Sequence, residues 1–253
     1  MIQLKNAEQI KAMKEAGRIT GEALLLARDH VREGVSTWEL DHLIREYIEK
    51  CGAKPSFLGL YGFPGSACIS INEEVIHGIP SKHRILREGD IVKIDTGAFI
   101  GGFHGDSART IPVGRVTSEA EKLIRVTRDS FFAGVQKLVP GNRIGDVGSA
   151  IDTLVRENGC STVKKYIGHG VGHALHEAPD VPNYGTPGRG VRLCAGMTIA
   201  IEPMVNSGTA EVDEMPDGWT VKTADRKLSA HYENTVALTS DGVIILTLID
   251  SDF

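Results

Sequence analysis

An internal repeat with an offset of 107 residues limits the folds that are open to this chain. The segment at 86–95, Leu-Arg-Glu-Gly-Asp-Ile-Val-Lys-Ile-Asp, aligns without a gap with the segment at 193–202, Leu-Cys-Ala-Gly-Met-Thr-Ile-Ala-Ile-Glu. The same offset takes earlier glycine and apolar positions onto matching ones: Gly34 onto Gly141, Leu40 onto Val147, Ile44 onto Ile151 and Gly52 onto Gly159. Matches of this kind predict two copies of one structural unit.

The chain length of 253 residues fits neither one ordinary domain nor two, because domains run to roughly 150 residues. The repeat explains this length if two halves, at about 1–116 and 117–253, form a single unit. No Ser/Pro-rich linker separates the halves. We therefore expect one domain over residues 1–253, with pseudo-twofold symmetry.

Each half shows helical periodicity first and strand-like alternation afterwards. Apolar spacing predicts helices over 7–32, from Ser36 or Thr37 to just before Gly52, over 117–138 and over 145–157. Alternation predicts strands over 68–76, 90–100 and 106–113, and over 166–174, 197–205 and 231–247. The acidic stretch 207–227 is expected to form a long surface hairpin loop. Two helix–helix–strand units predict an α+β fold with the helices on one face of an antiparallel sheet.

Composition and charge exclude several classes of protein. The 28 Lys and Arg against 33 Asp and Glu give a net charge of −5, whereas proteins that grip nucleic acid usually have a basic excess. No apolar run reaches the length of a membrane span, and the first residues lack the pattern of a signal peptide. The widely spaced cysteines fit reduced thiols. We expect a cytoplasmic monomer that does not associate with membranes.

Four carboxylates fall at related places in the two halves. Asp95 and Glu202 occupy matched positions of the repeat, while Asp106 and Glu233 lie in the next strand of each half. A salt bridge or an exposed face would explain one such acid alone. Twofold symmetry would instead bring all four together, where only cations offset their repulsion. No Arg or Lys cluster accompanies them, so two divalent metal ions, of Mn, Fe(II), Co or Zn, are predicted.

Histidines add to this set of acids. The segment Gly168-His-Gly-Val-Gly-His-Ala-Leu-His-Glu177 carries His169, His173 and His176, and its glycines argue against a helix and against a helical zinc motif. A strand that a ligand approaches closely fits better. His77 is expected at a strand end, before a Gly-Ile-Pro turn. Any single histidine here is more often structural, which is the interpretation we prefer for His104 and His173, but the joint convergence predicts an active site.

In combination the motifs are specific. They are Asn72-Glu-x-x-x-His-Gly-Ile-Pro80, Asp95, His-Gly-Asp106, Gly-His169-Gly-x-Gly, Ile-Glu202-Pro-Met-Val and Tyr-Glu233-Asn-Thr. From the first helix to Leu246 the sequence resembles the type I methionine aminopeptidases, in their bacterial short form. Those enzymes are pita-bread metallopeptidases, so the resemblance implies a pita-bread fold with two pseudo-twofold-related halves around a curved antiparallel sheet.

The resemblance implies a role for each matched residue. Five would bind a dinuclear metal centre, with Asp106 and Glu233 as bridges: Asp95, Asp106, His169, Glu202 and Glu233. His77 and His176 match the family's two substrate-contacting histidines, and Glu202 would also move a proton. A pocket for the methionine side chain would be formed by Cys68, Phe63 and Trp219, with Tyr61 and Leu175 at its edge.

The activity implied is that of a methionyl aminopeptidase, a metal-dependent hydrolase of peptide bonds. It would remove N-terminal methionine from nascent proteins and peptides with a small second residue, by metal-activated hydroxide attack on the first peptide bond. The partners implied are nascent N-termini. Transient ribosome contact through Lys222, Arg226 and Lys227 is a weaker expectation, because basic residues on a surface loop are more often only solvated.

Two alternatives stay open. An X-Pro aminopeptidase or prolidase would share the five ligands, although those enzymes usually carry a large additional amino-terminal domain. A non-catalytic binding protein on the same scaffold is the other alternative, because a fold does not by itself give a function. Loss of ligands would favour that alternative, and all five are present.

Overall fold

The structure is a computed structural model that describes residues 1–248. Its helices are α1 (Ala7–His30), α2 (Thr37–Lys50), the short 3-10 helix η1 (Leu60–Gly62), α3 (Ser118–Val135) and α4 (Ile144–Glu157). The strands of the first half are β1 (Lys54–Pro55), β2 (Ala67–Ile71), β3 (Glu74–Ile76), β4 (Ile91–Ile100) and β5 (Phe103–Pro112). Those of the second half are β6 (Ser161–Thr162), β7 (Gly168–Gly170), β8 (Glu177–Val181), β9 (Thr198–Ile201), β10 (Met204–Asn206), β11 (Val212–Glu214), β12 (Val221–Thr223), β13 (Ser229–His231), β14 (Asn234–Thr239) and β15 (Gly242–Ile245).

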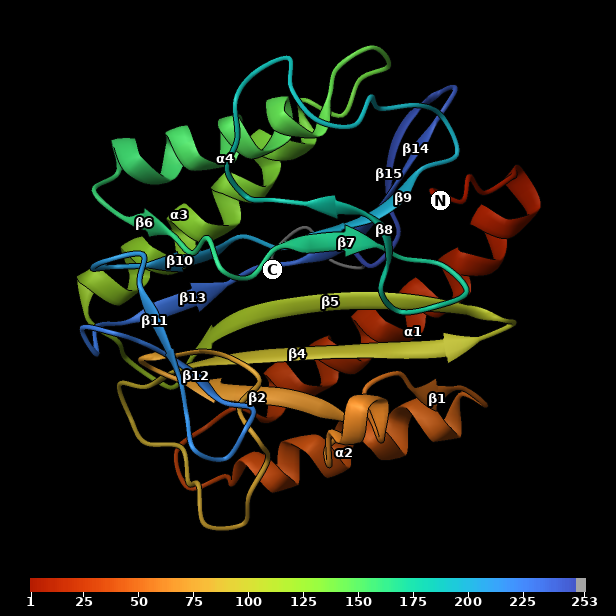
Figure 1. Ribbon diagram of the computed structural model, residues 1–253. Helices are drawn as coiled ribbons and strands as arrows, with labels where there is room; N and C mark the ends of the chain where they lie inside the picture. The colour runs from red at the N-terminus through yellow and green to blue at the C-terminus, as the bar shows by residue number, and fades with distance from the viewer. Residues whose placement is uncertain (249–253) are drawn as a thin grey trace.

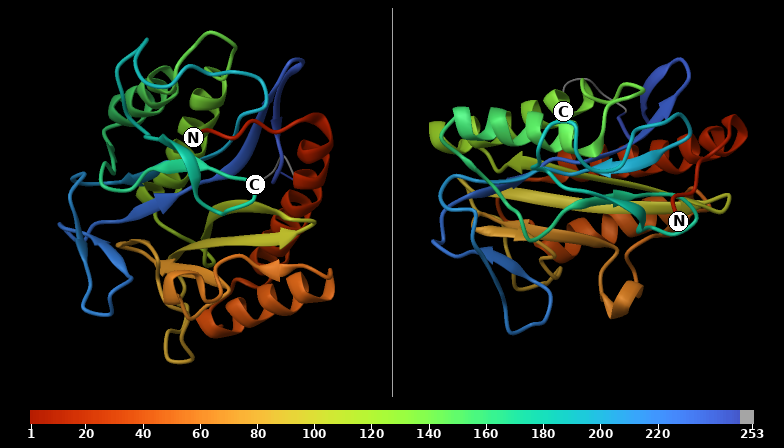
Figure 2. Two further views of the ribbon diagram at one scale, coloured as in Figure 1. Left: turned by 45° about the vertical axis from the view of Figure 1, so that its right-hand side comes forward. Right: turned by 45° about the horizontal axis from the view of Figure 1, so that its top comes forward.

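The offset of 107 residues holds in the structure. It takes all of α2 onto all of α4 and both residues of β1 onto both residues of β6. It also takes β4 onto the segment that contains β9 and β10. Figure 2 shows α3 and α4 at one end of the molecule and α2 at the other. The predicted duplication of helix and strand order is confirmed.

The first residues of α2 and α4 occupy matching positions of the repeat but differ in sequence. At α2, Ser36 accepts a hydrogen bond from the Glu39 amide, and Glu39 accepts one from the Ser36 amide. At the matching start of α4, Asp146 still accepts a hydrogen bond from the Arg143 amide at 2.8 Å. Asp146 thus satisfies this amide. The next two amides, of Ile144 and Gly145, donate to the carbonyls of Val191 and Arg189.

Alternation along the strands separates an apolar face from a polar one. Val92 and Ile94 of β4 pack in a buried cluster with residues of α1 and α2, including Leu24 and Ile44. Ile199 and Ile201 of β9 pack likewise against residues of α3 and α4. In Figure 1, α1 passes behind β4 and β5. Asp95 follows Ile94 and so points to the opposite face of the pleated strand, away from the helices.

All strand pairs in residues 1–248 are antiparallel, and the strands form four separate sheets. The halves join where β5 runs beside residues 231–235. At the centre of this seam, the backbones of Ala108 and Glu233 exchange two hydrogen bonds of 3.3 and 2.9 Å. At each end a threonine hydroxyl takes the place of a backbone partner: Thr110 bonds the backbone of His231, and Thr235 bonds that of Asp106. The seam places Asp106 and Glu233 close together.

Several predicted strands are shorter in the structure. Of 166–174 only Gly168–Gly170 is a strand, because the chain bends back at 171–176, where Gly172 donates to the Ala174 carbonyl. The segment 231–247 divides among β13, β14 and β15, since β13 pairs with β10 whereas β14 pairs with β9. The acidic stretch does form a hairpin, β11–β12, but β12 also pairs with β3. The hairpin is therefore part of the sheet structure and not only a surface loop.

None of the helices within residues 1–248 combines the length and the apolar character that crossing a membrane requires.

Candidate metal centre and active site

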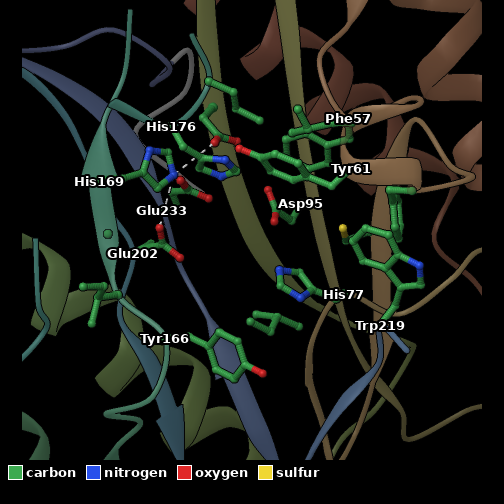
Figure 3. Close-up of a pocket in the computed structure, with 18 of the residues that line it drawn as sticks. Phe57, Tyr61, His77, Asp95, Tyr166, His169, His176, Glu202, Trp219 and Glu233 are labelled. Atoms are coloured by element: carbon green, nitrogen blue, oxygen red, sulfur yellow. Dashed lines mark ion pairs between the residues drawn. The ribbon is translucent and has the colours of Figure 1, made fainter. Parts of the chain in front are cut away.

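Four carboxylate side chains converge on the polar face of the strands. Asp95 lies on β4 and Asp106 on the adjacent β5, while Glu202 follows β9 and Glu233 lies between β13 and β14. Asp106 and Glu233 are only 3% and 2% exposed. Figure 3 shows Asp95 facing Glu202 and Glu233 across the same space. The four acidic side chains therefore lie close together, as predicted.

His169, on β7, lies within this group. Its Nε2 is 3.6 Å from Asp106 Oδ2 and 3.5 Å from Glu202 Oε1. Its Nδ1 lies 2.9 Å from the Gly170 carbonyl, which assigns the ring proton to Nδ1 and leaves the Nε2 lone pair toward the carboxylates. Ligand atoms of Asp106, His169 and Glu233 all lie within 4.8 Å of one another.

Burial disfavours the charged form of every ionisable group in this cluster. It raises the pKa of Asp106 to about 7. Burial, followed by the nearby carboxylates, raises the pKa of Asp95, Glu202 and Glu233 well above the usual range. Burial also lowers the pKa of His169 to about 4. A neutral imidazole offers these acids no positive charge, so ionised carboxylates here require another cation.

The donor atoms fit a divalent metal. Asp95 Oδ1 and Asp106 Oδ1 are buried without a hydrogen-bond partner among the described residues. Buried acceptors are rarely left without a partner unless something else binds them. Carboxylate oxygens together with one imidazole nitrogen are a donor set that suits Mn, Fe(II), Co or Zn. The residues present therefore fit a metal site.

A pocket of about 380 Å³ opens beside the carboxylates. Its apolar wall is a buried cluster of Phe57, Phe63, Cys68 and Leu175, against which Trp219 packs. The rings of Phe63 and Trp219 meet edge to face, with centroids 5.0 Å apart. Because Cys68 pairs with Asp95 in the strand register, the apolar wall begins directly beside the acidic cluster. The pocket can therefore hold an apolar side chain while a polar group next to it reaches the carboxylates.

The two other predicted histidines also line this pocket. His176 stacks on Tyr61, with centroids 5.9 Å apart, and stands edge-on to His169 at 4.4 Å. His77 stands edge-on to Tyr166 and Trp219. Figure 3 shows His176 and His77 on either side of Asp95. Each ring is thus placed to reach a ligand that lies over the acids.

The pocket residues predicted from the sequence all line it: Phe63, Cys68, Trp219, Tyr61 and Leu175. Tyr61 is at its mouth and 77% exposed, whereas Leu175 is a buried part of the wall and not at the edge. Sequence reasoning missed Phe57, Ile76 and Tyr166. The Tyr166 hydroxyl donates to Glu214 at 2.9 Å, so the acidic hairpin holds this ring in place. The sequence signal that could have identified Tyr166 is an aromatic residue two positions before Gly168, close to the predicted ligand His169.

Other residues considered from the sequence have structural contacts. His104 Nδ1 lies 2.8 Å from Ser56 Oγ, and His173 Nδ1 lies 2.8 Å from the Gly102 carbonyl. These contacts agree with the packing role preferred for both. Lys222 forms an ion pair with Glu73 at 2.8 Å, and Arg226 forms one with Asp213 at 3.0 Å. Their charges are therefore partly offset within the protein.

His77 gives a testable dependence of stability on pH. Burial, followed by the field of His176, lowers its pKa to about 4 from an ordinary value of 6.5. A lowered pKa means that stability is fully present above pH 6.5 and is lost as the pH falls toward 4, because the unfolded chain binds the proton first. As the pH falls across this range, the free energy of unfolding of metal-free wild type should drop more steeply than that of metal-free His77→Gln. The difference between the two slopes should be about 1.4 kcal/mol per pH unit. Urea unfolding at several pH values measures this difference, and parallel slopes for variant and wild type would contradict it.

Comparisons with known proteins place the chain in a family. The model of metallopeptidase family M24 matches residues 11–240. A methionine aminopeptidase of Clostridium perfringens is 55% identical over 249 residues, which cover 98% of this chain and all of that protein.

Solved structures agree on the fold. A methionine aminopeptidase from Thermotoga maritima superposes with a TM-score of 0.97 at 42% identity, over 98% of this chain and 100% of that one. A prolidase from Pyrococcus furiosus, 24% identical, shares the fold alone, with a TM-score of 0.80 over 98% of this chain and 66% of that one. The predicted α+β pita-bread fold is confirmed. The chain therefore belongs to metallopeptidase family M24, and over nearly its whole length it is similar to methionine aminopeptidases.

Proposed function

We propose that this chain is a methionyl aminopeptidase, which removes N-terminal methionine from nascent proteins and peptides whose second residue is small. The observation that carries the proposal is an aromatic, apolar pocket that ends at a buried cluster of carboxylates and one histidine. A thioether side chain gains dispersion and sulfur–aromatic contacts in such a pocket. The first peptide bond of the same residue then lies over the acids. The similarity to methionine aminopeptidases supports this assignment.

Two divalent ions, of Mn, Fe(II), Co or Zn, are the proposed cofactor. Asp106 and Glu233 are proposed to bridge them, Asp95 to complete one site, and His169 with Glu202 to complete the other. The short separations among Asp106, His169 and Glu233 support a metal site at these three residues. When bound, the ions supply Lewis-acid polarisation of the scissile carbonyl and lower the pKa of a nucleophilic water.

The chain's own residues supply the remaining steps. Glu202 lines the pocket 3.5 Å from His169 Nε2, where its carboxylate can accept a proton from the nucleophile and pass it to the leaving amine. His176 and His77 project into the pocket, where a ring N–H can donate a hydrogen bond to the carbonyl oxygen as it becomes negative. The walls around Cys68 and Phe63 exclude water from the bound side chain.

We propose that residues 1–253 act as a single catalytic domain, that the protein is a cytoplasmic monomer, and that it works without membrane attachment. Transient contact with the ribosome would use Lys227, together with Lys222 and Arg226. The charges of the last two are partly offset by Glu73 and Asp213. The ion pairs of Lys222 and Arg226 reduce the attraction of the β11–β12 hairpin to the phosphates of rRNA.

The assay that tests the function compares two peptides. Purified protein supplied with Mn or Co is expected to release methionine from Met-Ala-Ser, and a chelator should abolish the release. An X-Pro peptide should remain intact, which separates the proposal from the prolidase alternative. Cleavage confined to X-Pro bonds would overturn the assignment. Absence of any cleavage by metal-replete protein would favour the non-catalytic alternative.

A further inference from the structure

Lys5 forms a buried ion pair with the segment that carries His176. It precedes α1 and lies in the short amino-terminal segment, before the first element of the repeat. Its Nζ lies 2.5 Å from Glu177 Oε2, and the two side chains are only 3% and 8% exposed. Glu177 follows His176 directly in the chain. A residue at the start of the chain thus contacts the immediate neighbour of a pocket histidine 171 positions later.

The same ion pair closes the bend at 172–177. Glu177 Oε1 accepts a hydrogen bond from the Ala174 amide at 3.1 Å, and Gly172 donates to the Ala174 carbonyl at 3.0 Å. A Cβ on Gly172 would lie 2.4 Å from Lys5 Nζ, so the ammonium group packs directly against this glycine. Lys5, Gly172 and Glu177 therefore lock the bend whose outer residues, Leu175 and His176, line the pocket.

Lys5 is itself held from the other side. Its amide donates to the Gly196 carbonyl at 2.7 Å, and its Nζ also donates to the Gln3 carbonyl at 3.1 Å. Gly196 donates in turn to Leu238 of β14 at 2.8 Å. The bend joins β7 to β8, and these contacts connect it through Lys5 to β14 of the same five-stranded sheet. Lys5 thus ties the bend that carries His176 to β14, the strand that begins directly after Glu233.

We propose that Lys5 is a positioning residue for His176: the Lys5–Glu177 ion pair holds the 172–177 bend so that the His176 ring stays over the acidic cluster. The proposal rests on the proposed function, in which His176 contacts the reacting carbonyl. Lys5 touches neither substrate nor metal. Its removal should lower turnover through the geometry of His176, because misplacing a reacting group by about 1 Å costs up to roughly a hundredfold in rate.

The first experiment measures Lys5→Met, which keeps the chain length and removes the charge. We expect kcat on Met-Ala-Ser to fall about tenfold, with bound metal unchanged, and Lys5→Arg to restore most of the loss. Arg156→Met, which breaks the exposed Arg156–Asp152 pair on α4, is the matched control and should keep wild-type kcat. Wild-type kcat for well-folded Lys5→Met would overturn the proposal.

The decisive measurement places Lys5→Met in a His176→Ala background. If Lys5 acts through His176, adding Lys5→Met should leave kcat unchanged there. A second tenfold loss in that background would show that Lys5 acts independently of His176 and would overturn the proposal. If Lys5→Met fails to fold, Glu177→Gln answers the same question, since it keeps an acceptor for the Ala174 amide and removes only the charge.

A readout without turnover separates this proposal from the proposed function. Hydrogen exchange at the Ala174 amide should speed up at least tenfold in Lys5→Met and should stay at the wild-type rate in Arg156→Met. If wild-type protein releases no methionine while Lys5→Met still shows the faster exchange, only the proposed activity is overturned. Unchanged exchange in Lys5→Met, with an active wild type, would overturn only the positioning role.

Discussion

His176→Ala protein is expected to release methionine with a kcat lower by about 10²–10³ while it binds metal as the wild type does. The reason is that one donor to a developing oxyanion contributes this much to a rate. His176 lines the pocket, and it stands 4.4 Å, ring to ring, from His169 without belonging to the tight group of Asp106, His169 and Glu233. Steady-state kinetics on Met-Ala-Ser, with metal analysis of the same sample, gives both quantities.

A histidine far from the pocket provides the control for this variant. His42 on the surface of α2 contacts Glu46 of its own helix at 3.2 Å, so His42→Ala should keep wild-type turnover. Loss of metal from His176→Ala would mean that His176 is a ligand and that the proposed ligand set is wrong. An unchanged kcat would remove His176 from the reaction altogether.

Asp106→Asn protein should lose metal binding and, with it, at least 10³-fold in activity, because Asp106 is proposed to serve both ions. In the absence of metal, the same substitution is expected to increase the free energy of unfolding. Burial raises the pKa of Asp106 to about 7, so the ionised form destabilises the folded protein. A neutral amide of similar shape removes that penalty. The metal-free variant should therefore unfold at a higher urea concentration than metal-free wild type.

The advantage of Asp106→Asn should depend on pH in a defined direction. A raised pKa in the folded state means that stability is present at low pH and is lost as the pH rises through about 7. The difference between variant and wild type should therefore grow between pH 5 and pH 7.5, which unfolding in the presence of a chelator measures. Normal metal content in Asp106→Asn would show that Asp106 is not a ligand.

The repeat made much of the fold predictable. A gapless offset fixes the order of elements in one half once the other is known, and α2, α4, β1 and β6 follow it to the residue. Convergence of Asp95 with Glu202 followed from the same symmetry. Asp106 and Glu233 lie outside the gapless part, because the hairpin near Trp219 lengthens the second half before Glu233. Their place in the site was predicted from strand order and not from spacing.

Other features could not be read from the sequence because they depend on side chains that meet across long separations. The alternating pattern is the same in Gly168–Gly170 and in the residues that follow. The chain nevertheless bends at 172–177, where Lys5 and Glu177 make their contacts. Nothing in the local pattern around Thr110 or Thr235 distinguishes them from other strand threonines. Phe57 and Tyr166 line the pocket because separate loops bring them there.

The seam between β5 and residues 231–235 also determines at which stage of folding the active site forms. Ala108 and Glu233 meet only after a loop of more than a hundred residues closes, whereas β4 and β5 pair through a tight turn. Closing the longer loop costs more entropy, so local pairing within a half has less to overcome. The acids also come from both halves. A copy of this chain still under synthesis therefore cannot assemble its own site until residue 233 has emerged from the ribosome.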